Sequence, residues 1–307
     1  MSVMKNKYLV AVFSSGVISG FTGIFRRTIA TLWIDSFGFV FIRSSLGALF
    51  FAVAILLTDP RNFKVKLKDC WCFIGVGLVS FTGFNLCYFQ AMTLMSLSAA
   101  AILLYSAPVF VILFSKILFQ ESVTKRKLIS MGMAIVGCFF SSGVIAGDVR
   151  LSLPGLLFGL GSGVGYALFS IFGTLAMKRG YHSVTVNFWS CVLAAISLAL
   201  IGAYRTPLAV FPSGKTTGLL YAAVGFVTCF LPYMLYTYGL SGLEPGQASI
   251  TVSIEPVVAT AVGVLVYKEK LDVWILFGMA LVLSAIILLN KRQNRGPDAG
   301  GTKHIYN

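Results

Sequence analysis

The chain has 307 residues, of which 57% are hydrophobic and only 11% are charged, and its formal net charge is +14. Soluble proteins carry about 25% charged residues, so this composition excludes an ordinary soluble domain. The positive charge forms no basic face interleaved with aromatic side chains, which excludes a protein whose partner is a nucleic acid. The apolar residues instead form runs of about 20 residues, the length that crosses the core of a lipid bilayer.

Ten such runs follow one another along the chain and predict ten transmembrane helices. A helix is the expected element because it satisfies its own backbone hydrogen bonds where no water is present. The predicted spans are 8–29, 37–58, 70–92, 97–119, 127–146, 153–176, 183–203, 218–239, 246–267 and 273–290. The sequence therefore predicts an all-α, multi-pass membrane protein with a disordered cytoplasmic tail over residues 291–307.

Lysine and arginine residues at the ends of the spans, between them and in the two terminal segments are divided unevenly between the two sides of the membrane. With ten spans, fifteen of them lie on the side of the termini and seven on the opposite side. Positively charged loops stay in the cytoplasm. Both termini are therefore predicted to be cytoplasmic, and the protein is expected in the plasma (inner) membrane.

Residues in two parts of the chain match at a constant offset of 148 positions. The matched pairs include Tyr88 and Tyr236, Ala100 and Ala248, Pro108 and Pro256, and Glu121 and Glu269. They divide the chain into two five-helix repeats, residues 1–146 and 147–290. Because five is an odd number, the second repeat must enter the membrane from the opposite side, which predicts an inverted repeat. The two glutamates end spans four and nine and are interpreted as structural markers.

Glycine and proline residues predict where helices pack and bend. Gly155, Gly159 and Gly163 recur every four residues in the sixth span and indicate close packing against another helix. Pro108 and Pro256 remove a backbone donor inside the fourth and ninth spans, so they are interpreted as hinges.

Side chains that could form an enzyme active site or a metal centre are not clustered. The six cysteines are scattered over four spans without metal-ligand spacing, and the two histidines, His182 and His304, lie outside the spans. A membrane enzyme would need a convergent cluster of such groups. The sequence therefore predicts no catalytic residue, no metal and no cofactor.

One acidic residue, Glu255, lies near the middle of the ninth span, where a charge is costly and marks a functional candidate. Gln247, Thr251 and Glu255 are spaced by four and predict one polar stripe. The counterpart of Glu255 in the first repeat is Ala107, so the scaffold forms without this charge. Glu255 would bind an ammonium group, exchange a proton, or both, because burial disfavours its charged form. The alternative is that it is paired to another helix only for packing.

Further candidates for the binding site combine a cation with aromatic and amide side chains. Arg43, whose counterpart is Cys191, either reaches a cavity and holds a carboxylate or extends outward to the membrane interface. The remaining candidates lie at depth in four spans, where polar atoms need partners and aromatic faces could hold a cation. They are Asn85, Tyr88, Tyr105, Tyr166 and Tyr236.

The segment from Gly83 to Gly137 resembles the repeat of the EamA family within the drug/metabolite transporter superfamily. The resemblance rests on Tyr88, Ala91, Ser98, Ala99, Ala100, Pro108, Glu121, Lys127 and Gly132, and on Tyr236, Gly239, Ala248, the stretch 253–257 and Glu269 in the second copy. It implies a ten-helix inverted repeat that transports small metabolites, often amino acids and often outward. It also implies a cavity lined by spans one, three, four, six, eight and nine, which favours Glu255, Asn85 and Tyr88 over Arg43. The tryptophan usual in the first span is absent.

Three functions remain open from the sequence. The first is secondary active transport, as an exporter, of small polar metabolites such as amino acids or derivatives, by alternating access and with protons as one candidate coupling ion. The second is transport of organic cations, quaternary amines or drugs held by Glu255 and aromatic rings. The remote third is a membrane enzyme or sensor. Both a monomer and a homodimer fit the sequence.

Overall fold

The computed structural model describes residues 2–95, 97–141, 152–210, 215–268 and 272–290. Within these residues, nine helical segments are long and apolar enough to cross a membrane. A further helix, Lys125–Ser141, has 17 residues and ends where the description of the chain stops. The chain is therefore a multi-pass helical membrane protein, and the count of ten spans stays a prediction. The tail 291–307 and the boundary predicted at 146–147 lie outside the described residues.

The helices before residue 142 correspond to the first five predicted spans. Three of those spans are interrupted by a turn or by π-helical or 3₁₀ backbone. The helices are α1 (Ser2–Gly20), α2 (Thr22–Ala30), α3 (Ser36–Thr58), η1 (Pro60–Phe63), η2 (Leu67–Asp69), α4 (Cys70–Ile74), η3 (Gly75–Thr82), α5 (Gly83–Leu94), α6 (Leu97–Leu104), α7 (Ala107–Phe119) and α8 (Lys125–Ser141).

The helices after residue 151 correspond to the last five predicted spans. They are α9 (Leu153–Lys178), α10 (Ser183–Leu200), α11 (Arg205–Val210), α12 (Lys215–Gly225), η6 (Phe226–Phe230), α13 (Leu231–Leu240), α14 (Pro245–Val252), α15 (Glu255–Tyr267) and α16 (Val273–Asn290). The segments η3 and η6 are π-helical.

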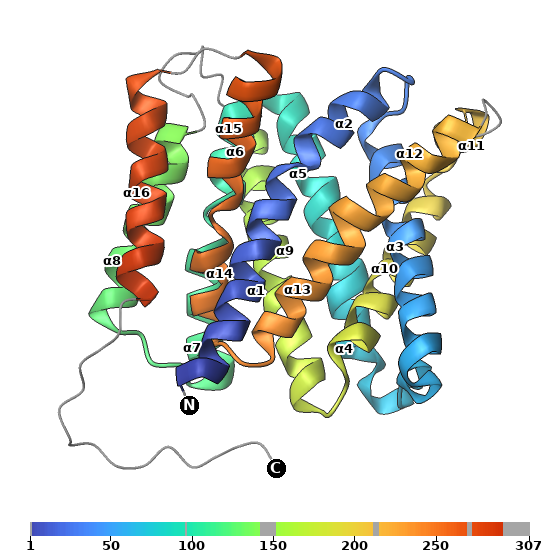
Figure 1. The fold of residues 1–307 in the computed structure, drawn as a ribbon, viewed down its shortest axis with the longest axis horizontal. Coiled ribbons are helices and arrows are strands. Elements are labelled where there is room, and N and C mark those ends of the chain that lie inside the picture. The colour runs from blue at the N-terminus through green and yellow to red at the C-terminus, as the bar shows by residue number, and fades with distance from the viewer. Residues whose placement is uncertain (1, 96, 142–151, 211–214, 269–271, 291–307) are drawn as a thin grey trace.

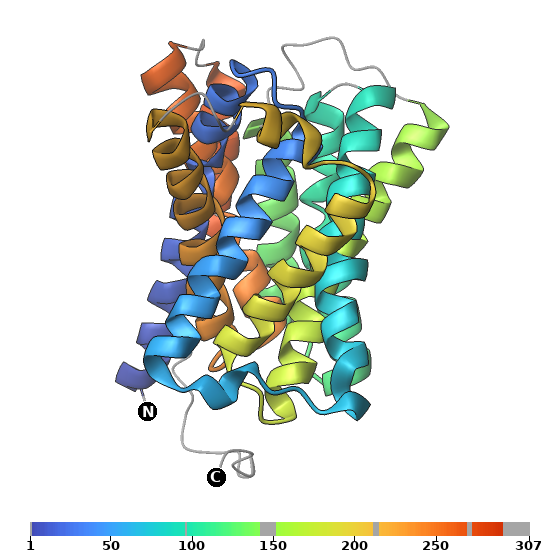
Figure 2. The same cartoon turned by 90° about the vertical axis from the view of Figure 1, so that its right-hand side faces the viewer.

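The long helices stand side by side and run between the two ends of one bundle (Figures 1 and 2). Helix α1 begins and α16 ends at the lower end of Figure 1, so the described chain starts and finishes on the same side. Helices α8 and α16 pack together at one edge of the bundle, and α3 packs on α10 at the other edge. Between them, α1 packs on α13 and α5 packs on α9.

Three irregular features of the backbone recur 148 residues apart. The break between α6 and α7 matches the break between α14 and α15, and η3 overlaps the position matched by η6. Gln120 and Lys268, which end α7 and α15, both have left-handed backbone with φ of 55°. These irregular backbone features are therefore separated by the same 148 residues as the matched residues in the sequence.

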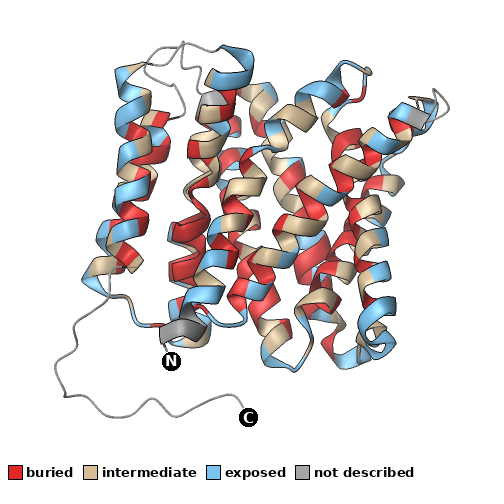
Figure 3. Ribbon diagram, viewed as in Figure 1, coloured by how far each residue is buried: buried red, intermediate tan, exposed pale blue. Residues whose placement is uncertain are grey.

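Buried residues concentrate where helices face one another (Figure 3). Many large apolar side chains are exposed on the outer surface. Leu57, Leu200 and Leu265 are each at least 80% exposed. Soluble proteins rarely expose such apolar area in one surface. The lipid bilayer accounts for it, because hydrocarbon chains solvate these side chains.

Helices α8 and α16 approach each other through glycines. A Cβ on Gly278 would lie 2.6 Å from the backbone oxygen of Gly137, and a Cβ on Gly137 would lie 2.8 Å from that of Gly278. Backbone atoms of a packed helix cannot move aside as a flexible side chain can. The contact therefore depends on both residues being glycine.

We expect Gly278→Ala to destabilise the protein by about 1–3 kcal/mol, because the added methyl group forces the two backbones apart. Gly132→Ala, on α8, is the matched control, since a Cβ there meets nothing within 4 Å. Thermal unfolding of the purified protein in detergent measures both variants. Equal unfolding temperatures for the two variants would contradict the packing argument.

Candidate functional site

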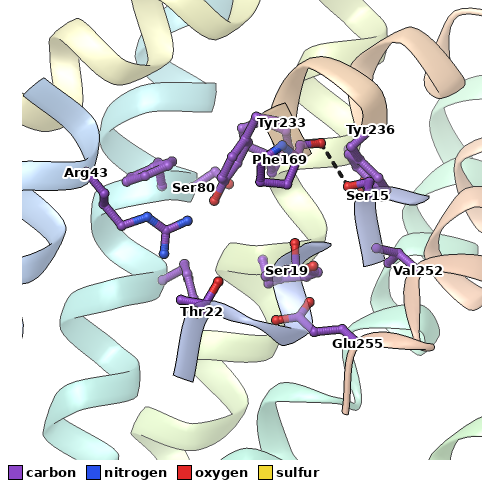
Figure 4. Close-up of a pocket in the computed structure, with 15 residues that line it drawn as sticks. Ser15, Ser19, Thr22, Arg43, Ser80, Phe169, Tyr233, Tyr236, Val252 and Glu255 are labelled. Atoms are coloured by element: carbon purple, nitrogen blue, oxygen red, sulfur yellow. Dashed lines mark hydrogen bonds between the residues drawn. The ribbon is translucent and has the colours of Figure 1, made fainter. Parts of the chain in front are cut away.

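A cavity of about 690 Å³ lies inside the bundle (Figure 4). Its lining combines hydroxyl groups, aromatic rings and two residues of opposite charge. The lining residues are Ser15, Ser19, Thr22, Arg43, Ser80, Phe81, Phe84, Tyr166, Phe169, Ser170, Pro232, Tyr233, Tyr236, Val252 and Glu255. Small-molecule sites place a few polar groups in a largely apolar wall, and the lining of this cavity has that composition.

Three hydroxyl side chains line the cavity from α1 and from the start of α2, and the neighbouring face of α1 contains two glycines. A Cβ on Gly16 would lie 2.8 Å from the backbone oxygen of Val252, and a Cβ on Gly20 would lie 3.0 Å from that of Glu255. These glycines let α1 rest on the break between α14 and α15. The adjacent face then presents Ser15, Ser19 and Thr22 to the cavity (Figure 4).

Glu255 lies at the first residue of α15, directly after the break in the ninth predicted span. The N-terminus of a helix carries partial positive charge, which favours a carboxylate there. Among the residues that the structure describes, no side chain forms a hydrogen bond or ion pair with this carboxylate, which points into the cavity (Figure 4). The carboxylate is therefore available to a ligand.

Arg43 reaches the cavity from α3, and a proline on another helix helps to hold it. Its Nη2 donates a hydrogen bond of 2.8 Å to the backbone oxygen of Thr228. The backbone oxygen of Thr228 lies one turn before Pro232, which has no N–H to donate to it. This oxygen can therefore accept the hydrogen bond from Arg43. The guanidinium also lies 5.7 Å from the ring centroids of both Phe81 and Tyr233. Arg43 thus has fixed partners, yet its Nε has none in the described structure.

Arg43 and Glu255 face one cavity without forming an ion pair. They extend from different walls, with Thr22 and Ser19 between them in the view of Figure 4. Opposite charges in a low-dielectric interior attract strongly when they meet. Their separation leaves room for a ligand that carries both charges.

A second cavity, of about 430 Å³, adjoins the first beside Glu255. The two cavities share Phe84, Tyr166, Val252 and Glu255. The rest of its lining comes from the two helix breaks and includes the predicted candidates Tyr105 and Pro108.

Of the predicted site residues, Glu255, Arg43, Tyr166 and Tyr236 line the first cavity. Tyr236 also shares a hydrogen bond of 2.7 Å with Ser170. The inclusion of Arg43 differs from the preference implied by the family resemblance, which placed the second span outside the cavity.

Four other predicted residues line neither cavity. The predicted polar stripe is interrupted, because α14 ends at Val252: Thr251 donates to the backbone oxygen of Gln247 at 2.8 Å, and Gln247 donates to Asn290 at 2.8 Å. Asn85 donates to the backbone oxygen of Phe81 at 2.6 Å. Tyr88 packs against buried Ala91 and Met95. Their contacts are those of helix packing, and a role in substrate binding stays a prediction.

The glycines of α9 face the fourth predicted span. A Cβ on Gly159 would lie 2.9 Å from the Cβ of Leu103, and one on Gly163 would lie 2.8 Å from the backbone oxygen of Leu103. A Cβ on Gly155 would meet the side chain of Met95. Helix α9 therefore approaches α6 and α7 closely next to the break between them. Pro256 is the second residue of α15, as Pro108 is of α7.

Sequence reasoning missed the hydroxyl groups of α1 and of the start of α2, and it missed the part played by Pro232. Ser15, Ser19 and Thr22 are spaced by four and three, the period of one helix face, and they lie beside Gly16 and Gly20. That pairing of a hydroxyl face with a glycine face was a usable signal. The bond to Arg43 was not, because it joins residues 185 positions apart.

The lower end of the bundle is held by buried charges from distant parts of the chain. Lys127 Nζ lies 2.6 Å from Glu121 Oε1 and 2.6 Å from Glu244 Oε2. The side chains of Lys127 and Glu121 are 9% and 5% exposed, whereas that of Glu244 is 53% exposed. A second cluster joins Asp69 to Arg179 and to the hydroxyl of Tyr181.

The amino-acid sequence and the fold were compared with those of known proteins. The profile of the EamA-like transporter family matches residues 6–143 and 153–291. An "Uncharacterized transporter" of Archaeoglobus fulgidus is 27% identical over 91% of this chain and 94% of its own. The "Uncharacterized transporter YyaM" of Bacillus subtilis is 22% identical over 80% of this chain and 81% of its own. A protein of known crystal structure matches with a TM-score of 0.76 at 17% identity, covering 93% of this chain and 96% of its own.

A helical membrane bundle around a charged cavity, with relatives named as transporters, defines a membrane transport protein. The chain belongs to the EamA-like transporter family, because the family profile covers nearly its whole length. The expected resemblance is confirmed.

We expect Lys127→Met to destabilise the protein by about 3–5 kcal/mol, because it leaves the buried carboxylate of Glu121 without its partner. Burial raises the pKa of Glu121 above its usual value, and Lys127 opposes that rise. When a carboxyl group has a raised pKa in the folded state, the folded protein loses stability as the pH rises from the usual pKa of that group toward the raised one. The loss in Lys127→Met should therefore be small at acid pH and grow toward neutral pH.

Thermal unfolding of the purified protein at an acid and a neutral pH measures this effect. The double variant Glu121→Gln, Lys127→Met is the control, since it leaves no buried charge at residue 121 and should recover most of the neutral-pH loss. An equal loss at both pH values, or no recovery in the double variant, would show that Lys127 acts through packing alone.

Proposed function

We propose that this protein is a secondary active transporter of small zwitterions, such as amino acids or their derivatives. The observation that carries the proposal is the cavity in which Arg43 and Glu255 face the same space without pairing. A guanidinium binds a carboxylate through two parallel hydrogen bonds, and a carboxylate binds an ammonium group. An amino acid carries both complementary charges on one carbon atom.

The aromatic lining favours a zwitterion over an organic cation. A cage for a quaternary amine needs ring faces open to the cation. The rings of Phe81 and Tyr233 already face the guanidinium of Arg43, each at 5.7 Å. A second cation placed there would meet like charge. Transport of organic cations or drugs is therefore the less favoured reading.

Alternating access around this cavity follows from an inverted repeat of two five-helix halves, which we infer for residues 1–146 and 147–290. A shift of 148 residues maps α1 onto α9 and α5 onto α13, so the contact of α1 with α13 corresponds to the contact of α9 with α5. The same shift maps α3 onto α10 and α8 onto α16, and the two helices of each of these pairs pack against each other. The recurrence of both helix breaks and both π-helical segments supports the same symmetry. Rocking of one half against the other would expose the site to each side in turn.

The proposed orientation places the lower end of Figure 1 in the cytoplasm of a cell bounded by the plasma membrane. Lysine and arginine residues of η1, of the start of α8 and of the end of α9 gather at that end, together with the start of α1. Such residues favour the cytoplasmic side. We propose export as the direction, in line with the family resemblance.

Glu255 is proposed to exchange a proton during transport. Glu255→Gln keeps the shape of the side chain but cannot release a proton, so the dependence of the transport rate on pH should disappear. Proteoliposomes loaded at one pH and diluted into another measure that dependence. A variant with the pH profile and rate of the wild type would rule out this role for Glu255.

Arg43 is proposed to bind the carboxylate of the substrate. Arg43→Lys keeps the charge but loses the planar fork, so binding of a zwitterion should weaken by roughly tenfold to a hundredfold, equivalent to about 1.4–2.8 kcal/mol. Binding of the corresponding amine without a carboxylate should not weaken. Isothermal titration of both ligands on the purified protein separates the cases, and equal losses for both ligands would assign Arg43 a structural role.

A further inference from the structure

The second cavity differs in chemistry from the first, although Glu255 belongs to both. Its own lining residues are Leu104, Tyr105, Ala107, Pro108, Ser249 and Ser253. Glu255 is the one charged residue among all those that line it. The hydroxyl of Ser253 is already used, because it donates to the backbone oxygen of Ser249 at 3.1 Å. The second cavity is therefore an apolar lobe that opens beside the carboxylate.

The two helix breaks give this apolar lobe its shape. Tyr105 lies in the break between α6 and α7, with Leu104 before it and Ala107 after it. Ser253 lies in the matching break between α14 and α15. Both broken spans therefore contribute to the wall of this apolar lobe.

We propose that this apolar lobe receives the side chain of the transported zwitterion, so that the substrates are amino acids with sizeable apolar side chains. This inference rests on the proposed function. The α-carbon of an amino acid joins its ammonium, carboxylate and side chain. With the ammonium on Glu255, at the junction of the two cavities, the carboxylate extends toward Arg43 and the side chain enters the apolar lobe.

Burial of apolar surface in this apolar lobe makes affinity depend on the side chain. Each methylene placed in such a pocket improves discrimination by roughly tenfold or more. Affinity should therefore rise from glycine through alanine and valine to leucine. Leucine should also exceed asparagine, which is similar in size but loses hydrogen bonds to water on entering an apolar space.

The test measures the rise in unfolding temperature of the purified full-length protein with each of these five amino acids and with phenylalanine, since a ligand stabilises the state it binds. Ala107→Leu fills the apolar lobe and should abolish the advantage of leucine over alanine while binding of glycine persists. Leu104→Ala enlarges the apolar lobe and should move the optimum from leucine to phenylalanine. Ala101→Leu, on α6 and outside both cavities, is the matched control and should keep the order of the wild type.

The outcomes separate this inference from the function on which it rests. If the wild type binds asparagine as tightly as leucine, the side chain does not enter an apolar space and the inference is wrong, while zwitterion transport stands. If Ala107→Leu and Leu104→Ala both keep the order of the wild type, the apolar lobe does not hold the side chain. If no amino acid is bound at all, the proposed function fails together with the inference.

Discussion

In the core of a bilayer, a backbone N–H or C=O without a partner costs several kcal/mol, and both broken helices of this protein must meet that constraint. The breaks between α6 and α7 and between α14 and α15 lie inside the bundle, covered by glycine faces of α9 and α1. Gly16 and Gly163 allow approach to backbone oxygens at their respective breaks. Irregular backbone is tolerated only where protein or a cavity surrounds it, so the position of the two cavities follows from the position of the breaks.

The sequence was sufficient to predict the parts of the structure that depend on local pattern. Apolar runs predicted the helices, and Pro108 and Pro256 marked two of the places where a span is broken. It failed where a break changes the direction of side chains. Regular spacing placed Gln247 and Thr251 with Glu255 on one face, but α14 ends at Val252, so the face is not continuous.

Contacts between distant helices were beyond the reach of the sequence. The rings and the carbonyl that hold Arg43 come from two spans far from Arg43 in the chain, and no spacing rule connects them to it. The family resemblance even favoured other residues over Arg43, because it concerns which spans line a cavity in general. A long side chain such as that of Arg43 can reach the cavity from a span that does not itself line it. The direction of such a side chain depends on tertiary packing.

The charged residues Glu255 and Arg43 do not recur at the 148-residue offset, although features of the backbone do. The counterparts of Glu255 and Arg43 are Ala107 and Cys191, both small and uncharged, although helix breaks and π-helical segments recur at the same offset. Cys191 lies with its sulfur 3.6 Å from that of Cys229, in the apolar packing next to Arg43. Each charged position thus has a neutral counterpart 148 residues away in the chain, so the two charges would give a bound ligand a defined orientation.

The two carboxylates that form ion pairs with Lys127 differ in burial, so dissolved salt affects the two ion pairs differently. Dissolved ions screen charges in contact with water over about 8 Å at physiological ionic strength, and buried pairs much less. The bond to half-exposed Glu244 would therefore weaken as salt concentration rises, while the bond to buried Glu121 would persist. Separation at the lower end would therefore begin at Glu244, so the ionic strength of the solution around that end would influence how readily its helices come apart.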